Sequence, residues 1–410
     1  MKLLVVSSVG DLYVGLGCMV RRYGGGGVLD YTATQGDGKG ILDILILSSC
    51  ERFLYGAFTS KIVICWDVAT AGVQGVIRVN KRLTSMIYRS METLVPGKGV
   101  LLASDKSGDV WAIDAPLLAN KVLVAGHTAS VVTDLTYFNI DNKGYIATSD
   151  RDEKIRVSFF PQLAQIQTYC LGHTNVVTSV VYIEKFKLLI TCGWDHSVYL
   201  WEPLTGKIIY QLYTKYRSTT TEAVESAEND DENNDENNDE NDATDKAYDH
   251  KKAGNYPIKL VVYDDIVAII FSGISLVQLY TVVFDGNVHS IVENSSITLP
   301  SPPADIYFSN AGDLCVLLPP PDHISMYRIS VPQSLQYSMV IINQLQADCN
   351  EKNICFNQEM ILMAEEGHNS GLEKEKLKDN YMGKWKERRE ENDKKRKKVE
   401  KPIENKEIIE

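Results

Sequence analysis

The sequence lacks any pair of cysteines separated by two residues, the spacing on which zinc ribbons and redox-active disulfides depend. Its eight cysteines are scattered along 410 residues. Scattered cysteines without a pairing pattern are typical of a protein from a reducing compartment. We expect them to act as small buried hydrophobic side chains.

Motifs for catalysis and cofactor binding are also missing. None of the seven histidines forms a His-Glu-x-x-His pair, and no Gly-x-Ser-x-Gly or phosphate-binding loop occurs. The glycine run at Gly24–Gly27 lacks the Lys-Ser/Thr that grips a phosphate, so we expect a flexible loop there. We therefore predict a protein that is not an enzyme and that has no catalytic residue, metal site or cofactor.

Acidic charge is concentrated in one segment. Residues 222–245 contain 12 acidic residues and no Lys or Arg. Without them the 54 acidic residues fall to 42, which equals the 42 Lys and Arg. Residues 216–255 offer too little apolar surface to offset the entropy lost on folding, so we predict a disordered insert. The neutral remainder can still carry a local patch that faces RNA.

Two Gly-His dipeptides begin units of similar length. Asp195 follows His173 by 22 residues and Trp201 comes six residues later, while Asp152 follows His127 by 25 residues. This spacing is typical of WD repeats, in which about 40 residues form a four-stranded sheet. A buried His, a Thr, a turn Asp and a strand Trp can then hydrogen-bond in series. We predict this series for His173, Thr191, Asp195 and Trp201, and part of it for His127 and Asp152.

Short strands separated by turn signals continue on both sides of these units. The predicted units are 41–67, 84–114, 127–159, 173–201, 258–284 and 305–329. The N-terminal strands Leu3–Val6 and Leu12–Leu16 are expected to join C-terminal strands at Ser338–Ile342, Ile354–Phe356 and Met360–Met363. This closure predicts an all-β, seven-bladed WD-repeat propeller over residues 1–364, with the acidic insert between its fourth and fifth blades.

The last segment, residues 365–410, is predicted to be a basic, partly helical tail. Leu377, Tyr381 and Trp385 recur every four residues, which is a helical spacing. The run Lys394, Lys395, Arg396, Lys397 and Lys398 indicates a nuclear-import signal or a nucleic-acid contact, and hence a nuclear location. A solvated chain end is the alternative.

Charged residues crowd the turn after Asp150. Asp152 is assigned to the hydrogen-bonded series, which leaves Arg151, Glu153, Lys154 and Arg156 without a structural role. Charges at the rim of an interface set its register and its association rate. We therefore predict that these four residues contact a protein partner.

The run Asp150–Ser158, followed by Cys-Leu-Gly-His-Thr at 170–174, resembles the non-catalytic WD-repeat subunit of the tRNA (guanine-N7)-methyltransferase. The run Ala103–Val110 is similar to the preceding blade of that family. The resemblance implies a scaffold without a cofactor of its own, bound as a heterodimer to a catalytic subunit that uses S-adenosylmethionine. The substrate of the complex would be the variable-loop guanosine of tRNA, which the scaffold would contact only as part of the complex. No membrane partner is expected.

The alternative function is that of a generic WD-repeat adaptor, such as a substrate receptor of a ubiquitin ligase. Those receptors often carry Trp-Asp-x-Arg at the end of a blade. Here Trp66-Asp67 is followed by Val-Ala, and Trp201 by Glu-Pro, so that mark is absent.

Overall fold

The computed structural model describes residues 2–25, 27–32, 40–90, 99–214, 255–286 and 288–318, and the backbone of 325–330 and 338–341. Every regular element within these ranges is a β-strand, so the predicted all-β class is confirmed. The strands form seven four-stranded antiparallel sheets, in which each strand pairs with its neighbours in sequence. In the same ranges no helix is long and apolar enough to cross a membrane.

The strand bounds follow the chain in groups of four. The first two sheets contain β1 (Leu4–Val6), β2 (Leu12–Leu16), β3 (Met19–Gly24) and β4 (Gly27–Thr32), then β5 (Leu42–Leu47), β6 (Phe53–Phe58), β7 (Ile62–Asp67) and β8 (Val73–Arg78). The third and fourth contain β9 (Leu83–Ser90), β10 (Gly99–Asp105), β11 (Asp109–Ala115) and β12 (Lys121–Gly126), then β13 (Val132–Ile140), β14 (Lys143–Asp150), β15 (Lys154–Phe160) and β16 (Ile166–Leu171).

The remaining three sheets have the same layout. The fifth contains β17 (Val177–Ile183), β18 (Leu188–Gly193), β19 (Ser197–Glu202) and β20 (Lys207–Tyr213). The sixth contains β21 (Pro257–Tyr263), β22 (Ile266–Phe271), β23 (Leu276–Phe284) and β24 (His289–Thr298). The seventh contains β25 (Asp305–Phe308), β26 (Asp313–Leu318), β27 (Ser325–Ser330) and β28 (Ser338–Ile341).

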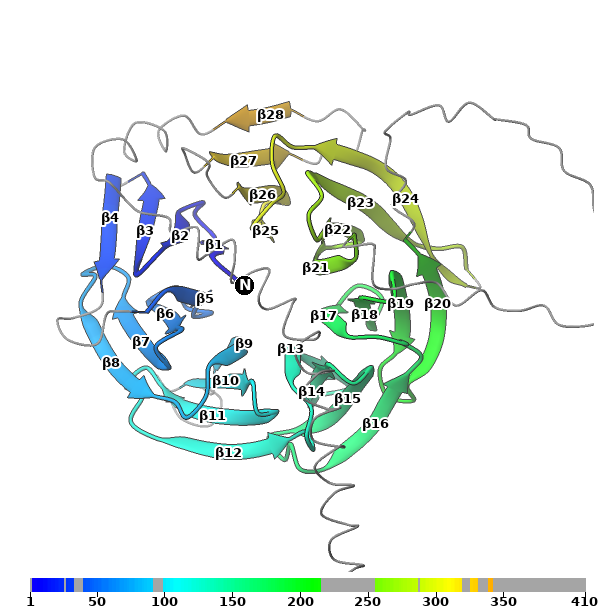
Figure 1. Cartoon of the computed structure of the whole chain (residues 1–410), viewed down its shortest axis with the longest axis horizontal. Helices are drawn as coiled ribbons and strands as arrows, with labels where there is room; N and C mark the ends of the chain where they lie inside the picture. Colours follow the sequence, from blue (N-terminus) through cyan, green and yellow to red (C-terminus); the bar gives the residue numbers. More distant parts are fainter. Residues whose placement is uncertain are drawn as a thin grey trace, which may run out of the picture. The chain divides into compact units, whose positions relative to one another are not determined.

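The sheets stand around a central axis, with the first strand of each sheet innermost (Figure 1). Neighbouring innermost strands contact one another all the way round, including β25 with β1. Because strand direction alternates within each sheet, the turns between second and third strands lie on the same face as the connections between sheets. We call this the upper face, and the face with the other turns the lower face.

The hydrophobic core lies between neighbouring sheets, where apolar side chains from both faces meet. Tyr31 and Trp66 illustrate the contact between the first two sheets, since both are fully buried and their rings meet edge to face. Trp66 donates its Nε1–H to the carbonyl of Thr32 at 3.0 Å, and the Tyr31 hydroxyl donates to the carbonyl of Val68 at 2.8 Å. Both aromatic side chains can therefore be buried with their polar atoms paired.

The predicted closure of the ring is wrong. The N-terminal strands do not complete a C-terminal sheet, because β3 and β4 give the N-terminus four strands of its own. The glycine run was expected to be a flexible loop, but Gly24 and Gly27 pair across a hairpin turn that makes these two strands possible. β28 supplies the fourth strand of the C-terminal sheet. The strands predicted at Ile354–Phe356 and Met360–Met363 lie outside the described residues.

Closure instead uses a buried carboxylate. Asp305 of β25 accepts the backbone N–H groups of Leu3 at 2.6 Å and Leu4 at 3.0 Å, and it forms an ion pair with Lys259 of β21. Lys2 then pairs with Ile44 through an isolated parallel bridge to β5. One carboxylate therefore joins the first sheet to the last two sheets, which lie at the other end of the described chain. The predicted tail and nearly all of the predicted insert fall outside the described residues.

Candidate partner-binding site

His173, Thr191, Asp195 and Trp201 form one hydrogen-bonded series within the sheet of β17–β20. His173 Nδ1 lies 2.8 Å from Asp195 Oδ2, and its Nε2 lies 2.8 Å from Thr191 Oγ1. Trp201 donates its Nε1–H to the same hydroxyl at 2.8 Å. Because the Asp195 carboxylate only accepts, the ring proton of neutral His173 is assigned to Nδ1. Nε2 then accepts from the Thr191 hydroxyl, which in turn accepts the Trp201 indole N–H.

The Asp195 carboxylate is held in its charged form. Burial alone would raise the pKa of Asp195, but hydrogen bonds from His173 and from the backbone of Thr174 and Ser197 outweigh burial and lower it. The series therefore links the connection before β17 to the turn after β18 and leaves none of its polar atoms unpaired.

In the preceding sheet the predicted role of Asp152 is wrong, because Asp150 holds the histidine. His127 Nδ1 lies 2.9 Å from Asp150 Oδ2, and Nε2 lies 2.8 Å from Thr148 Oγ1. Asp152 is exposed, and its carboxylate faces Arg151 at 3.5 Å. Asp150 ends β14 and is buried, so its carboxylate can reach the interior whereas that of the turn residue does not.

Strand register explains the difference between the two sheets. Asp150 pairs with Val132 at the start of β13, and Gly193 pairs with Val177 at the start of β17, so the two residues occupy the same position. Glycine has no carboxylate to offer, and the fifth sheet obtains one from Asp195, two residues later. The Gly-His spacing alone did not reveal this choice between two aspartates.

Asp105 repeats the arrangement of Asp150 one sheet earlier. Its Oδ1 accepts the N–H groups of Ser107 at 2.7 Å and Asp109 at 3.3 Å, while Oδ2 accepts the Trp111 indole N–H at 2.9 Å. Asp150 Oδ1 likewise accepts the N–H groups two and four residues later, each at 2.9 Å. Our sequence reasoning missed both aspartates, although a shared Ser-Asp at the strand end was a usable signal.

Arg156 lies inside the sheet and is only 8% exposed. Its Nη1–H donates to the carbonyl of Gly126 at 2.9 Å. Tyr199 takes the equivalent position in the next sheet, where its hydroxyl donates to the carbonyl of Gly172 at 3.0 Å. Each side chain therefore ties the third strand of its sheet to the end of the preceding sheet. This internal bond sets Arg156 apart from the other three residues of the predicted charged cluster.

The Arg156 guanidinium has no carboxylate within ion-pair distance among the described residues, and its Nε is buried without an acceptor. Burial lowers the pKa of Arg156, while Tyr169 and Asp150 act in the opposite direction. A buried cation without an anionic partner is unfavourable. A carboxylate placed next to the Arg156 guanidinium would therefore be stabilising.

Arg151, Glu153 and Lys154 form the charged turn, on the upper face. Glu153 and Lys154 are exposed and Arg151 is half-buried. Glu153 adopts a φ of 74°, in the left-handed region, and the Asp150 carboxylate fixes the turn around it. The sequence folds this way because Asp150 satisfies the turn's N–H groups, which lets neighbouring charges point outward.

An exposed apolar strip lies beside the charged turn, on the outermost strand β16. Ile166, Tyr169 and Leu171 are 41%, 42% and 60% exposed, and we call them the apolar edge. Leu171 pairs with Lys154, and Tyr169 pairs with Arg156, across β15 and β16. Apolar contact area next to charged groups is the composition of a protein interface with a polar rim. Sequence reasoning missed this edge because outer and inner strands look alike in a short apolar run.

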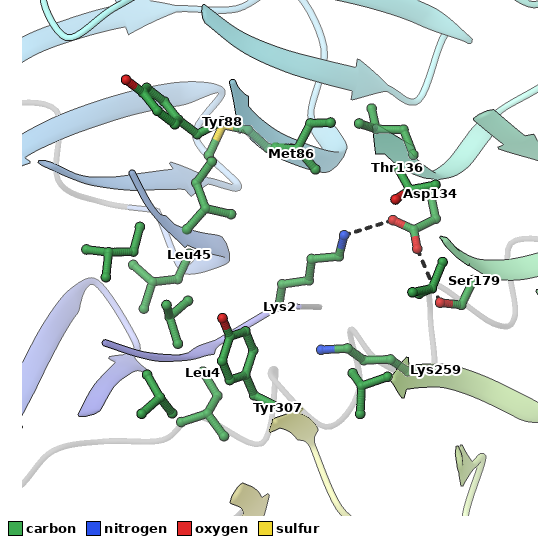
Figure 2. A pocket seen from close by; sticks show the side chains of 18 of the residues that line it. Lys2, Leu4, Leu45, Met86, Tyr88, Asp134, Thr136, Ser179, Lys259 and Tyr307 are labelled. Atoms are coloured by element: carbon green, nitrogen blue, oxygen red, sulfur yellow. Dashed lines mark hydrogen bonds and ion pairs between the residues drawn. The ribbon is translucent and has the colours of Figure 1, made fainter. Parts of the chain in front are cut away.

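A cavity of about 470 Å³ occupies the middle of the ring (Figure 2). Figure 2 shows the Lys2 ammonium directed at Asp134, where Nζ lies 2.8 Å from Oδ1. Asp134 also accepts hydrogen bonds from Ser85 at 2.7 Å and Ser179 at 3.2 Å. Burial would raise the pKa of Asp134, but Lys2 and Ser85 lower it. These groups join sheets to one another across the axis.

The predicted import run at residues 394–398 lies outside the described residues. In the described part of the chain, no group of three or more His, Cys, Asp or Glu side chains is placed to hold a metal ion.

Residues 114–326, just over half of the chain, match the family model described as the tRNA methyltransferase TRM82 WD40 domain. The chain belongs to this family. The WD-repeat class predicted from the Gly-His units is thereby confirmed.

Three curated relatives carry related names. The tRNA (guanine-N(7)-)-methyltransferase non-catalytic subunit wuho of Anopheles gambiae is 36% identical over 30% of this chain and 31% of its own length. The subunit named wdr4 of Xenopus laevis is 36% identical over 33% and 32%. The subunit named TRM82 of Saccharomyces cerevisiae is 27% identical over 41% and 38%. The matches span about a third of the length of these relatives.

Solved structures share the fold. The WD40 repeats of RRP9 align with a TM-score of 0.57 and 16% identity, covering 76% of this chain and 85% of that one. A chain of the mitotic checkpoint complex aligns with a TM-score of 0.58 and 15% identity, covering 77% and 86%.

Proposed function

We propose that this protein is the non-catalytic scaffold subunit of a heterodimeric tRNA (guanine-N7)-methyltransferase. The family match carries the proposal, since its relatives are named as non-catalytic subunits of that enzyme. In this role the chain binds and stabilises a catalytic subunit, which supplies the methyl-donor site, and reaches tRNA through the complex. The basic tail directs the complex to the nucleus. The ubiquitin-ligase alternative is not favoured by these relatives.

The catalytic subunit binds at the charged turn and the apolar edge. Tyr169 and Leu171 provide apolar area that a partner can bury, and Arg151, Glu153 and Lys154 form its charged rim. Aromatic side chains at the centre of such a surface commonly dominate the binding energy.

Arg156 lies behind this surface and gives it specificity. Its guanidinium lacks a carboxylate among the described residues, and it lies beside Tyr169 on the adjoining strand. A carboxylate supplied by the catalytic subunit would neutralise this charge in a desolvated site. Truncating one member of such an interfacial pair costs about 2–5 kcal/mol of binding free energy.

An Arg156→Leu variant tests the proposal against a matched buried arginine. The full-length protein and its catalytic partner are co-expressed, and we measure the affinity of the complex, tRNA methylation and the melting temperature of the free scaffold. Arg156→Leu should weaken the complex by more than tenfold. The control is Arg21→Leu, because Arg21 is buried in the first sheet and already paired with Asp30 at 2.6 Å.

The control should lower the melting temperature without weakening the complex. If both variants only lower the melting temperature, Arg156 is structural and the interface lies elsewhere. Methylation by the scaffold without its partner, or failure of the wild-type pair to associate, would refute the proposed function itself.

A further inference from the structure

Three exposed lysines lie on the upper face of the second and third sheets. Lys61 lies in the turn between β6 and β7, Lys81 lies in the connection from β8 to β9, and Lys106 lies in the turn between β10 and β11. We call these three residues the basic arc. Each lysine comes from a different turn or connection. The three therefore form one arc only in the folded ring.

Backbone hydrogen bonds join the three turns into one continuous path. The carbonyl of Lys61 accepts the N–H of Val79 at 2.9 Å, which ties the first turn to the connection that carries Lys81. The carbonyl of Arg82 accepts the N–H of Lys106 at 3.1 Å, which ties that connection to the third turn. The lysines are therefore held on one ordered strip of backbone.

The same path continues to the charged turn. The carbonyl of Gly108 accepts the N–H of His127 at 2.8 Å, and the carbonyl of Val131 accepts the N–H of Arg151 at 2.9 Å. Gly108 has a φ of 92°, and an added Cβ would lie 2.2 Å from the carbonyl oxygen of Ser130, so the approach requires glycine. The basic arc thus adjoins the surface proposed for the catalytic subunit.

Within the basic arc itself, negative charge is neutralised or turned inward. Asp43 forms an ion pair with Arg82, whose Nε lies 2.6 Å from its carboxylate. Asp105 is buried, and its carboxylate accepts a hydrogen bond from the backbone N–H of Ser107 in the turn that follows it. Burial and the nearby Asp105 raise the pKa of half-buried Asp109. Residues 59–61, 79–83 and 105–109, which carry the arc, therefore contain no exposed acidic residue of their own.

The lower face has exposed lysines without this segregation. Lys143, the first residue of β14, follows a turn that exposes Asp141, and Lys187 lies in a turn that exposes Glu184. Lys185 is paired with Asp264 at 2.6 Å. Among these described turns, positive charge on the lower face is accordingly mixed with negative charge, whereas the arc turns of the second and third sheets expose one sign.

We propose that the basic arc binds the sugar-phosphate backbone of the tRNA held by the complex, an inference that rests on the proposed function. Lysine ammonium groups on a rigid path suit phosphates, which are contacted independently of base sequence and fix the position of the RNA. Because the arc adjoins the partner surface, RNA on the arc runs toward the catalytic subunit. The arc thus positions the substrate for chemistry carried out by the neighbouring protein.

A charge-reversal triple, Lys61→Glu with Lys81→Glu and Lys106→Glu, tests the arc. Its matched control is Lys143→Glu with Lys187→Glu and Lys207→Glu, since all three control lysines are exposed on the lower face and the net charge changes equally. Dissociation constants for unmodified tRNA are measured from about 50 to 200 mM salt. The measurements use both the full-length chain alone and the purified heterodimer.

The arc triple should weaken tRNA binding about tenfold or more at low salt, and should reduce the slope of log K against log salt by about 2–3. The control triple should bind within about twofold of wild type. Equal weakening by the two triples, or none by either, overturns the proposal. Lys→Gln versions of both triples repeat the comparison if the Glu variants melt early. Failure of the heterodimer to form refutes the proposed function, while the isolated chain still tests the arc.

Discussion

Asp105 and Asp150 occupy the same position in consecutive sheets, and each carboxylate serves two structures at once. One oxygen accepts the N–H groups of the following turn, and the other accepts a ring N–H, from Trp111 in one sheet and from His127 in the next. The turn and the interior are thereby fixed by a single side chain. The charged turn owes its shape to this buried carboxylate, which accepts backbone N–H groups of the turn, including that of Lys154.

The first prediction separates Asp150 from Asp152. Asp150→Ala should destabilise the propeller by about 1–3 kcal/mol, because it leaves His127 and two turn N–H groups without their acceptor. Asp152→Ala should change stability by less than about 0.5 kcal/mol, since its carboxylate is exposed. Urea unfolding of both variants measures the difference. Equal stability of the two would contradict the assignment.

The second prediction concerns acid. The pKa values of Asp134, Asp150 and Asp195 in the folded protein are lowered below their ordinary value of 3.8. Their contribution to stability is therefore fully present above that pH and is lost as the pH falls through the lower folded values. The urea midpoint should drop steeply below about pH 4. An Asp150→Asn, Asp195→Asn double variant should show a shallower drop, and an unchanged drop would assign the effect to other carboxylates.

The third prediction concerns ring closure. Lys259→Met leaves the buried Asp305 carboxylate without its cation, and should destabilise the protein by about 3–5 kcal/mol. Adding Asp305→Asn should restore part of this loss by removing the uncompensated charge. Lys185→Met is the control, because Lys185 forms a solvent-exposed pair with Asp264 and Asp265 and should barely change the melting temperature. A small effect of Lys259→Met would show that closure does not depend on this ion pair.

The fourth prediction concerns the apolar edge. Leu171→Asp should weaken binding of the catalytic subunit by at least about tenfold, because it places a charge in a surface that the partner desolvates. Val292→Asp changes a similarly exposed side chain on β24, in the sixth sheet, and should leave binding unchanged. Both variants should melt like wild type. Isothermal titration with the partner supplies the affinities, and equal affinities for the two would place the interface on another edge.

Local spacing was enough to predict the His173 series, because a histidine, a threonine, an aspartate and a tryptophan within one repeat can bond only in a few ways. Spacing could not choose between Asp150 and Asp152, which lie two residues apart, because it does not show that β14 ends at Asp150 and that Asp152 lies in the exposed turn. Spacing also could not reveal that Arg156 is buried, because a charged residue in a strand is ordinarily predicted to be exposed. The hydrogen bond from Leu3 to Asp305 joins residues 302 positions apart, and only the folded ring brings them together.

The position of Asp134 bears on how the molecule loses its structure. Lys2, Ser85 and Ser179 come from three other sheets, and the first of these sheets is not a neighbour of the one that carries Asp134. In an open array of repeats, each unit touches only adjacent ones and the ends can fray independently. Here the loss of the first sheet would strip a buried carboxylate of its cation on the opposite side of the axis. Heat or denaturant should therefore melt the ring cooperatively, as one all-or-none unit, even though it is built from repeats.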